Sequence, residues 1–567
     1  MKQKILIIED HEGVAIAIEH QLQLIGSFHV DQSRNVVQAL KRFSSAHKHP
    51  YDAVLCDYDL GESTNGQQLL EYLRAEKRIP RRTGFIMITA EASYSSVASA
   101  VELAPDAYLL KPFTQAGLAQ RLEFVLEKRK ALKAVYGALD LASPDLAAAI
   151  AACNALVVAG DRFALEALKI KADCLIRQEQ WGEAANVYDK IIAWRPTPWA
   201  EVGRARTLRL MGYPELAEEK LKSTLSSFPQ FVAAYDEMAS LESDRGETVR
   251  AQEILEQAHA IVPSNRRSRA LGLMALENGD HEKASRFLKI VTQRDRHGLL
   301  RSTEDFFGLA NALRQMNCHD QAMEVLDSIT QHFPESRPLM VRKMAAEAIT
   351  LVAANRGFDA KKRVRDALEL LTEQMAPQAQ LELAEACHRC GEVKRGNEIF
   401  IHVAENWQEN AAVVLQTKAV MARTGAGAEA ASIIDESLRE LTKTNNEAAR
   451  HMKAGHFDDA VNDMQKVAKR LLSHATIQAN YVQALLKWVE HNAPQNLMSL
   501  PQHSRPRQHL ALAREHLQQL AKIKADHPRL PPLQRLLVKL TGETDILKPA
   551  ADDHASLDEA CTMEIGE

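Results

Sequence analysis

The sequence predicts a doubly wound α/β domain with a five-stranded parallel sheet, followed by a long all-helical superhelix of repeated helix pairs. Two observations lead to this prediction. Between the amino terminus and Lys111, four short apolar runs each end in a polar residue, with helical patterns between them. Farther along the chain, small residues, glycines and prolines recur at nearly even intervals. Buried parallel strands are typically continuous apolar runs, and a fixed period of about 34 residues indicates stacked repeats.

The expected strands bring polar residues to one edge of the sheet. The apolar runs at 4–8, 53–56, 85–88 and 107–110 are followed directly by Glu9-Asp10, Asp57, Thr89 and Lys111. A further strand is expected near 28–31, and helices at about 12–24, 36–44, 67–76, 95–103 and 115–133. Ligand sites of such sheets lie beyond the carboxyl ends of the strands, so we expect these side chains to converge there.

The residue types at this edge are suited to phosphoryl transfer. A carboxylate can attack phosphorus and form an aspartyl phosphate. Further acids beside it would raise its pKa by repulsion unless a divalent cation sits among them, and Mg²⁺ prefers such oxygen ligands. The Lys111 ammonium can bind the phosphoryl group as a point charge, and the Thr89 hydroxyl can donate to one of its oxygens. Taken singly, each residue could equally be a helix cap, a core residue or a solvated charge.

The ordered set Glu9-Asp10, Asp57, Thr89 and Lys111-Pro112 resembles the receiver domain of two-component response regulators over residues 1–125. The resemblance implies that Asp57 accepts a phosphoryl group from a sensor histidine kinase or a phosphotransfer protein. It also implies that Thr89 and Lys111 assist this transfer.

The same resemblance implies further roles. Glu9, Asp10, Asp57 and Asp59 would hold Mg²⁺, Glu9 through water and Asp59 through its backbone carbonyl. Thr89 and Tyr108 would form a switch pair, in which the ring follows the hydroxyl inward. The Lys111-Pro112 peptide bond would be cis. Gly61 is a departure, because it stands where the family usually has proline.

The second half of the prediction rests on aligned small residues. Five alanines recur at nearly equal steps, of which the last is the longest: Ala184, Ala217, Ala251, Ala284 and Ala322. Small residues stand twelve positions before them, glycines stand five before the middle three, and Pro196, Pro229, Pro263 and Pro334 stand twelve after four of them. This pattern resembles the tetratricopeptide repeat, in which small residues allow close helix packing and proline ends the second helix.

These patterns divide the chain into five parts. We expect a receiver domain at 1–125, a helical connector at 126–160, tetratricopeptide repeats at 161–334, degenerate repeats with a cap at 335–548, and a disordered acidic tail at 549–567. No Pro/Gly/Ser-rich hinge follows the receiver, which indicates a stiff helical connection. Cys387 and Cys390 lack a second pair at ligand spacing and are interpreted as core or surface thiols rather than a zinc site.

Composition and charge narrow the function classes. A net charge of −5 gives no reason to expect nucleic acid or a membrane as the main partner. Seven scattered cysteines, the absence of a signal-peptide pattern and the absence of a membrane-length apolar tract favour a cytoplasmic protein. No kinase, nucleotide-hydrolysing or Ser/His/Asp motif is present, so the chain is predicted to be a signalling protein and not an enzyme. A DNA-binding role for the repeats is disfavoured by charge.

The repeats are predicted to bind a protein. Basic residues expected on the groove-lining first helices favour an acidic or C-terminal carboxylate segment as ligand, although a solvated charged face is an equal alternative. These candidates are Lys169, Arg177, Arg206, Arg209, Arg266, Arg269 and Arg314. The favoured function is a phosphorylation-dependent regulator with a protein-binding output. The alternative is a phosphate sink or inhibitor of a sensor histidine kinase docked through the repeats.

Overall fold

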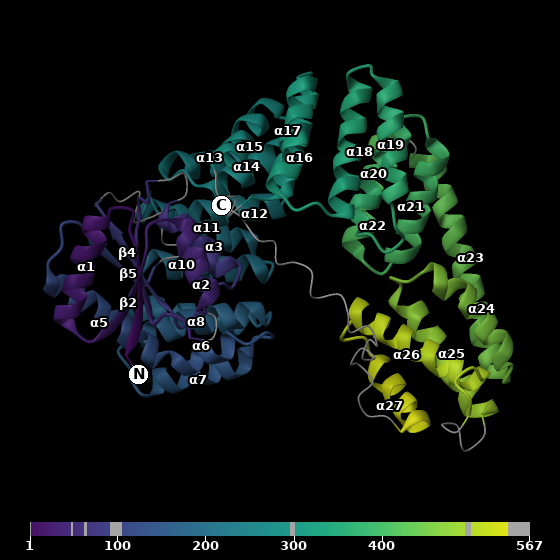
Figure 1. Cartoon of the computed structure of the whole chain (residues 1–567), viewed down its shortest axis with the longest axis horizontal. Helices are drawn as coiled ribbons and strands as arrows, with labels where there is room; N and C mark the ends of the chain where they lie inside the picture. Colours follow the sequence, from purple (N-terminus) through teal and green to yellow (C-terminus); the bar gives the residue numbers. More distant parts are fainter. Residues whose placement is uncertain are drawn as a thin grey trace, which may run out of the picture. The chain divides into compact units, whose positions relative to one another are not determined.

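The computed structural model describes residues 2–46, 49–61, 65–90, 105–294, 301–425, 427–493 and 500–542. The chain forms two compact units, Met1–Phe333 and Pro334–Glu567, and each unit is described by itself (Figure 1). The helix expected at 95–103, most of the loop after Gly61 and the tail at 549–567 lie outside the described residues.

The first unit opens with the expected five-stranded parallel sheet, in the order β2-β1-β3-β4-β5. The strands are β1 (Gln3–Ile8), β2 (Phe28–Ser33), β3 (Ala53–Asp57), β4 (Gly84–Thr89) and β5 (Ala107–Leu110). The helices among them are α1 (Glu12–Ile25), α2 (Val36–Ser45), α3 (Gly66–Ala75) and α5 (Gln115–Ala131). The strand order reverses at β1, so the carboxyl ends of β1 and β3 flank the point where such sheets bind ligands.

Helices cover both faces of this sheet, because alternate residues of each strand point to opposite sides. Ile5 and Ile7 pack in one core with α1 and α5. Leu6 and Ile8 pack in a second core with α2 and α3. Figure 1 shows α1 and α5 on one side of the strands and α2 and α3 on the other. The sheet is therefore buried on both faces, as its continuous apolar runs predict.

The connector leaves the receiver almost without interruption. Between α5 and α6 (Lys133–Leu139) only Leu132 departs from helical assignment, and it still donates its backbone N–H to the Lys128 carbonyl. The Leu132 carbonyl in turn accepts from the Tyr136 N–H at 2.9 Å. The connection is thus helical, and α7 (Leu146–Val158) follows it.

Ten further helices of the first unit form five antiparallel pairs, as the repeat pattern predicts. They are α8 (Ala164–Arg177), α9 (Trp181–Trp194), α10 (Pro198–Leu210), α11 (Pro214–Ser227), α12 (Val232–Asp244), α13 (Thr248–Ile261), α14 (Asn265–Glu277), α15 (His281–Arg294), α16 (Thr303–Gln315) and α17 (His319–His332). All five aligned alanines are completely buried, and each of the four prolines stands two residues beyond the end of a second helix.

The turn inside each pair needs a left-handed residue. Gly212, Gly246 and Gly279 have φ values of +82°, +82° and +74°. The equivalent positions of the first and fifth pairs are Glu179 and Asn317, both at φ +60°. The turn conformation is therefore kept in all five pairs, although glycine, which adopts it without strain, occupies only three of them.

The second unit contains ten described helices. They are α18 (Arg337–Ala353), α19 (Gly357–Leu370), α20 (Pro377–Arg389), α21 (Val393–Trp407), α22 (Ala411–Thr424), α23 (Gly427–Ala454), α24 (Phe457–Arg470), α25 (Ala475–Asn492), α26 (Arg505–Ile523) and α27 (Leu530–Thr541). Cys387 and Cys390 are free and buried, and burial raises their thiol pKa values to about 12 and about 11. Both are thus core thiols. Among all the described helices, none joins the length and the apolar character that crossing a bilayer demands.

We predict that the second unit loses stability as the pH falls below about 6.5. Four histidines, His474, His509, His516 and His527, are buried there, and burial lowers their pKa values, that of His509 to about 4. A lowered histidine pKa means that the unfolded chain binds the proton more readily. The stabilisation is therefore complete above pH 6.5 and is lost progressively as the pH approaches 4.

For His509 alone this loss amounts to roughly 2 kcal/mol at pH 5. Hydrogen exchange of the α25 and α26 amides between pH 7 and pH 5, corrected for intrinsic rates, measures it. His509→Leu should reduce the pH dependence, whereas His503→Leu, at an exposed position, should leave it unchanged. Equal pH dependence in the two variants would show that His509 contributes nothing to it.

Candidate functional site

The predicted phosphoryl-transfer residues meet at the carboxyl edge of the sheet. Glu9 follows β1, Asp57 and Thr89 end β3 and β4, and Lys111 follows β5. The strands are in register here, with Asp57 opposite Ile88 and Thr89 opposite Leu110. Glu9, Asp57 and Thr89 are all buried.

Lys111 connects two of the carboxylates. Its Nζ donates to Glu9 Oε2 at 2.9 Å and to Asp57 Oδ2 at 2.7 Å. Its backbone N–H donates to the Thr89 carbonyl at 2.8 Å, and the Lys111-Pro112 peptide bond is cis, as expected. Burial opposes the charge on Lys111, but the two carboxylates outweigh it and raise the pKa of the ammonium. Burial raises the pKa of Glu9, and the negative charge of Asp57 raises it further.

Asp10 lies close to Glu9 and to His11, a residue that the sequence patterns did not indicate as part of the site. Ligand atoms of Glu9, Asp10 and His11 lie within 4.8 Å of one another. His11 Nδ1 is 3.0 Å from Asp10 Oδ1. Burial opposes the ionisation of Asp10, but the adjacent imidazole outweighs it and holds the pKa of this carboxyl below its usual value.

The residues of this group fit a divalent cation. Glu9 is 1% exposed, and its Oε1 has no hydrogen-bond partner among the described residues. A buried carboxylate oxygen without a partner is costly, and a cation beside it would remove that cost. The Lys111 ammonium holds the neighbouring Asp57 carboxylate in place. Asp59 directs its side chain elsewhere, accepting from the Gly61 N–H at 3.1 Å.

Gly61 explains the departure from the family pattern at this loop. Its φ is +65°, and an added Cβ would lie 2.7 Å from Asp10 Oδ2. Proline fixes φ near −65°, so it does not fit this backbone. Glycine thus leaves room beside the Asp10 carboxylate.

Tyr108 points into the sheet core that contains α2 and α3. Its hydroxyl is buried and has no hydrogen-bond partner among the described residues, and burial raises its pKa. It pairs with Met87 across the β4–β5 ladder, two residues before Thr89. In this structure the ring is therefore turned inward.

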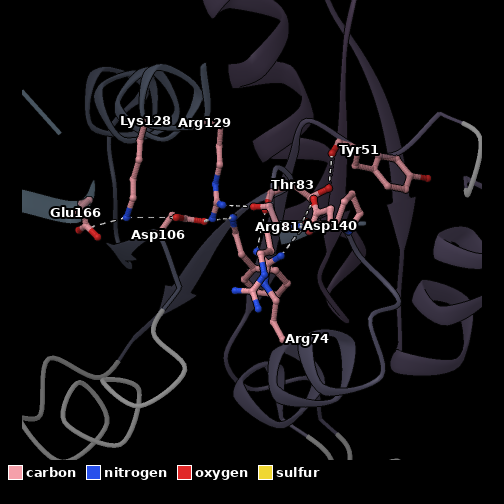
Figure 2. Close-up of polar contacts among 11 residues, drawn as sticks. Tyr51, Arg74, Arg81, Thr83, Asp106, Lys128, Arg129, Asp140 and Glu166 are labelled. Atoms are coloured by element: carbon pink, nitrogen blue, oxygen red, sulfur yellow. Dashed lines mark hydrogen bonds and ion pairs between the residues drawn. The ribbon is translucent and has the colours of Figure 1, made fainter. Parts of the chain in front are cut away.

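A second polar cluster lies at the opposite end of β5 and joins the receiver to the helices that follow it (Figure 2). The Asp106 carboxylate, 6% exposed, accepts from the Phe85 N–H at 2.9 Å and contacts the Arg129 guanidinium. Lys128 Nζ lies 3.5 Å from Asp106 and 3.3 Å from Glu166 of α8. Burial opposes the ionisation of Asp106, but Arg129 and Lys128 outweigh it and hold its pKa below the usual value.

The loop before β4 extends this cluster. Arg74 donates to the Pro80 and Thr83 carbonyls at 2.8 and 2.9 Å, and burial lowers its pKa to about 10. The Arg81 N–H donates to both carboxylate oxygens of Asp140, just beyond α6, at 3.0 Å. We call Asp106, Lys128, Arg129 and Glu166 the junction cluster. It links β5 to α5 and α8.

The basic residues predicted to line the groove differ in their contacts and exposure. Arg209 pairs with Glu237 at 2.7 Å and also contacts Asp244, while Arg269 pairs with Asp305 at 2.6 Å. Both therefore connect the first helix of one pair to that of the next. Lys169 lies over the Trp199 ring at 5.3 Å. Arg177, Arg206 and Arg266 are exposed on α8, α10 and α14, and Arg314 is half-buried on α16.

The amino-terminal part of the chain is similar to known proteins. Residues 5–123 match the family described as response regulator receiver domain. Chemotaxis protein CheY-3 of Vibrio cholerae is 27% identical over 125 residues, which are 22% of this chain and 92% of the relative. Chemotaxis protein CheY of Pseudomonas aeruginosa is also 27% identical over 125 residues, covering 22% of this chain and 97% of the relative.

Among solved structures, Vibrio cholerae CheY4 is 22% identical and covers 22% of this chain and 100% of its own, with a TM-score of 0.20. A tetratricopeptide repeat protein from Parabacteroides merdae is 14% identical and covers 47% of this chain and 98% of its own, with a TM-score of 0.29. The amino-terminal domain is a response regulator receiver domain. Repeated helix pairs follow this domain in the chain.

Proposed function

We propose that Asp57 accepts a phosphoryl group from a histidine kinase or a phosphotransfer protein, and that phosphorylation changes the affinity of the repeats for a protein partner. The observation that carries this proposal is the placement of Asp57. Asp57 ends β3, and its carboxylate is held by Lys111 at 2.7 Å. It lies near Glu9, whose buried Oε1 has no hydrogen-bond partner among the described residues. The receiver family of residues 5–123 supports the same chemistry.

The transfer is a displacement at phosphorus. An Asp57 oxygen attacks the phosphorus of a phosphohistidine, the new O–P bond forms as the P–N bond breaks, and the released imidazole nitrogen takes up a proton. Lys111 stays beside the transferred group and offsets its negative charge, while Thr89 donates a hydrogen bond to one phosphoryl oxygen. Mg²⁺, held by Glu9, Asp10, Asp57 and the Asp59 carbonyl, would supply further positive charge to the phosphoryl oxygens.

The strand β5 offers a path from this site to the repeats. Lys111 stands at one end of the strand, Tyr108 lies within it, and Asp106 at its other end belongs to the junction cluster. Phosphorylation adds a charge of about −1.5 to −2 next to Lys111. Lys111 must then share its charge between Glu9 and the new group, and any resulting shift of β5 acts on Lys128 and, through Glu166, on α8.

We expect phosphorylated and unphosphorylated protein to differ in partner affinity. The full chain, immobilised with and without acetyl phosphate and Mg²⁺, is used to capture a partner, whose dissociation constant is then measured for both forms. Asp57→Ala should bind with one affinity whether or not the phosphodonor is present. Lys128→Ala, which removes the link to Glu166, should still accept the phosphoryl group but show a smaller affinity difference.

The size of the affinity difference decides between two functions. To invert a 1:99 equilibrium between two conformations, phosphorylation must favour one of them by about 5.5 kcal/mol. Even a partial shift of this equilibrium gives a several-fold change in partner affinity. Equal partner affinity in both forms would reject the switch. Phosphoryl flow from a kinase into the receiver would then favour the phosphate-sink alternative.

A further inference from the structure

We infer that His11 adds a nitrogen ligand to the carboxylates of Glu9 and Asp10 and strengthens the binding of a divalent transition-metal ion, such as Co²⁺, relative to Mg²⁺. The inference rests on the proposed function, because it concerns the cation of the same site. His11 is not among the residues to which that proposal assigns Mg²⁺, and the ion belongs to a different chemical class.

The three side chains have the spacing of ligands around one ion. His11 Nδ1 is 3.0 Å from Asp10 Oδ1 and 4.0 Å from Glu9 Oε1, and all three ligand atoms lie within 4.8 Å of one another. Nitrogen and carboxylate oxygen bind such ions at about 2.0–2.2 Å, so two ligands of one ion are about 3 Å apart at a right angle and about 4.2 Å apart when opposite. The observed separations lie in or close to this range.

The unpaired oxygen of Glu9 is independent support for a ligand. Lys111 holds Glu9 Oε2 at 2.9 Å, which fixes the carboxylate, and the other oxygen remains buried without a hydrogen bond among the described residues. That oxygen is the one from which the His11 distance of 4.0 Å is measured. The buried carboxylate thus presents a fixed, unsatisfied acceptor toward the imidazole.

An imidazole in the ligand set changes which ion is favoured. Mg²⁺ takes oxygen ligands and keeps several waters, whereas imidazole nitrogen suits the later transition ions, and Co²⁺ binds more tightly than Mn²⁺ in the general order of affinities. The His11 side chain is 76% exposed, so its ring can turn toward a bound ion without displacing core atoms. An added Cβ at Gly61 would lie 2.7 Å from Asp10 Oδ2, so glycine avoids a clash with this carboxylate.

Metal titration of the unphosphorylated full chain tests the inference. Co²⁺ binding is followed by its visible absorption, and Mg²⁺ binding by competition with Co²⁺. We expect His11→Ala to weaken Co²⁺ binding roughly 10- to 100-fold and Mg²⁺ binding less than about 3-fold. His20→Ala, at an exposed position of α1, is the matched control and should change neither.

Two results would overturn the inference, and they differ in what else they reject. If both ions bind but Co²⁺ affinity is the same in wild type and His11→Ala, His11 is not a ligand and the proposed function is untouched. If neither ion binds the wild-type chain, the metal site itself is wrong, and the metal-assisted part of the proposed function fails with it.

Discussion

Asp106→Ala is expected to destabilise the first unit by about 3–5 kcal/mol, because it removes the one carboxylate that faces both Lys128 and Arg129 in the described junction cluster. The substitution also leaves the Phe85 N–H without its acceptor. Breaking a buried ion pair from one side is costly, since the Arg129 charge then stays buried without this carboxylate. Urea unfolding followed by circular dichroism measures the loss.

Glu127→Ala is the matched control for Asp106→Ala. Glu127 pairs with Arg162 at 2.5 Å, but both side chains are about half exposed, so its removal should cost at most about 1 kcal/mol. Similar stability for the two variants would contradict the importance of the junction cluster. The pKa of Asp106 is lowered, so its stabilisation should be present above about pH 3.9, the pKa of an unfolded aspartate, and be lost as the pH falls through the lower folded value.

Gly66→Ala is expected to abolish phosphorylation of Asp57 and to destabilise the receiver by about 3 kcal/mol or more. An added Cβ at this first residue of α3 would lie 2.2 Å from the Asp57 carbonyl oxygen and 3.0 Å from Cys56 Sγ. The Gly66 N–H donates a hydrogen bond to the Tyr58 carbonyl at 2.8 Å, so the residue cannot move away from β3 without losing that hydrogen bond. The Asp57 backbone must move instead, which displaces its carboxylate from Lys111.

Gly13→Ala provides the comparison, because an added Cβ there meets no atom within 4 Å. Its stability should stay within about 0.5 kcal/mol of wild type, or rise slightly because alanine is the better helix former. Urea unfolding and labelling with acetyl phosphate measure both properties. A Gly66→Ala protein with wild-type stability and labelling would show that the close approach of α3 to β3 does not hold Asp57.

Much of the fold and of the site could be predicted from the sequence, because both follow from regular spacing of residues along the chain. A strand alternates its side chains with a period of two, and parallel strands end at a common edge. Asp57, Thr89 and Lys111 could therefore be placed together although they lie far apart in the sequence. The burial of the aligned alanines between paired helices was equally predictable, since close helix packing tolerates only small residues at such positions.

Contacts that do not follow from regular spacing along the chain could not be predicted. Asp106 meets Arg129, and Lys128 meets Glu166, only once the fold brings β5, α5 and α8 together, and nothing in the local sequence distinguishes these charges from solvated ones. His11 faces Asp10 through side-chain torsions at a strand end, where no repeating geometry applies. Arg209 is similar, because its partner Glu237 comes from the next helix pair.

The most direct test of the account is to identify the side chain that carries phosphate. Purified full-length protein is incubated with acetyl phosphate or a competent histidine kinase plus Mg²⁺, and the label is mapped by peptide mass spectrometry after hydroxylamine or borohydride treatment. We predict a hydroxylamine-labile acyl phosphate on Asp57 that is absent from Asp57→Ala. No label on the wild-type protein, or an equal label on Asp57→Ala, would contradict the account.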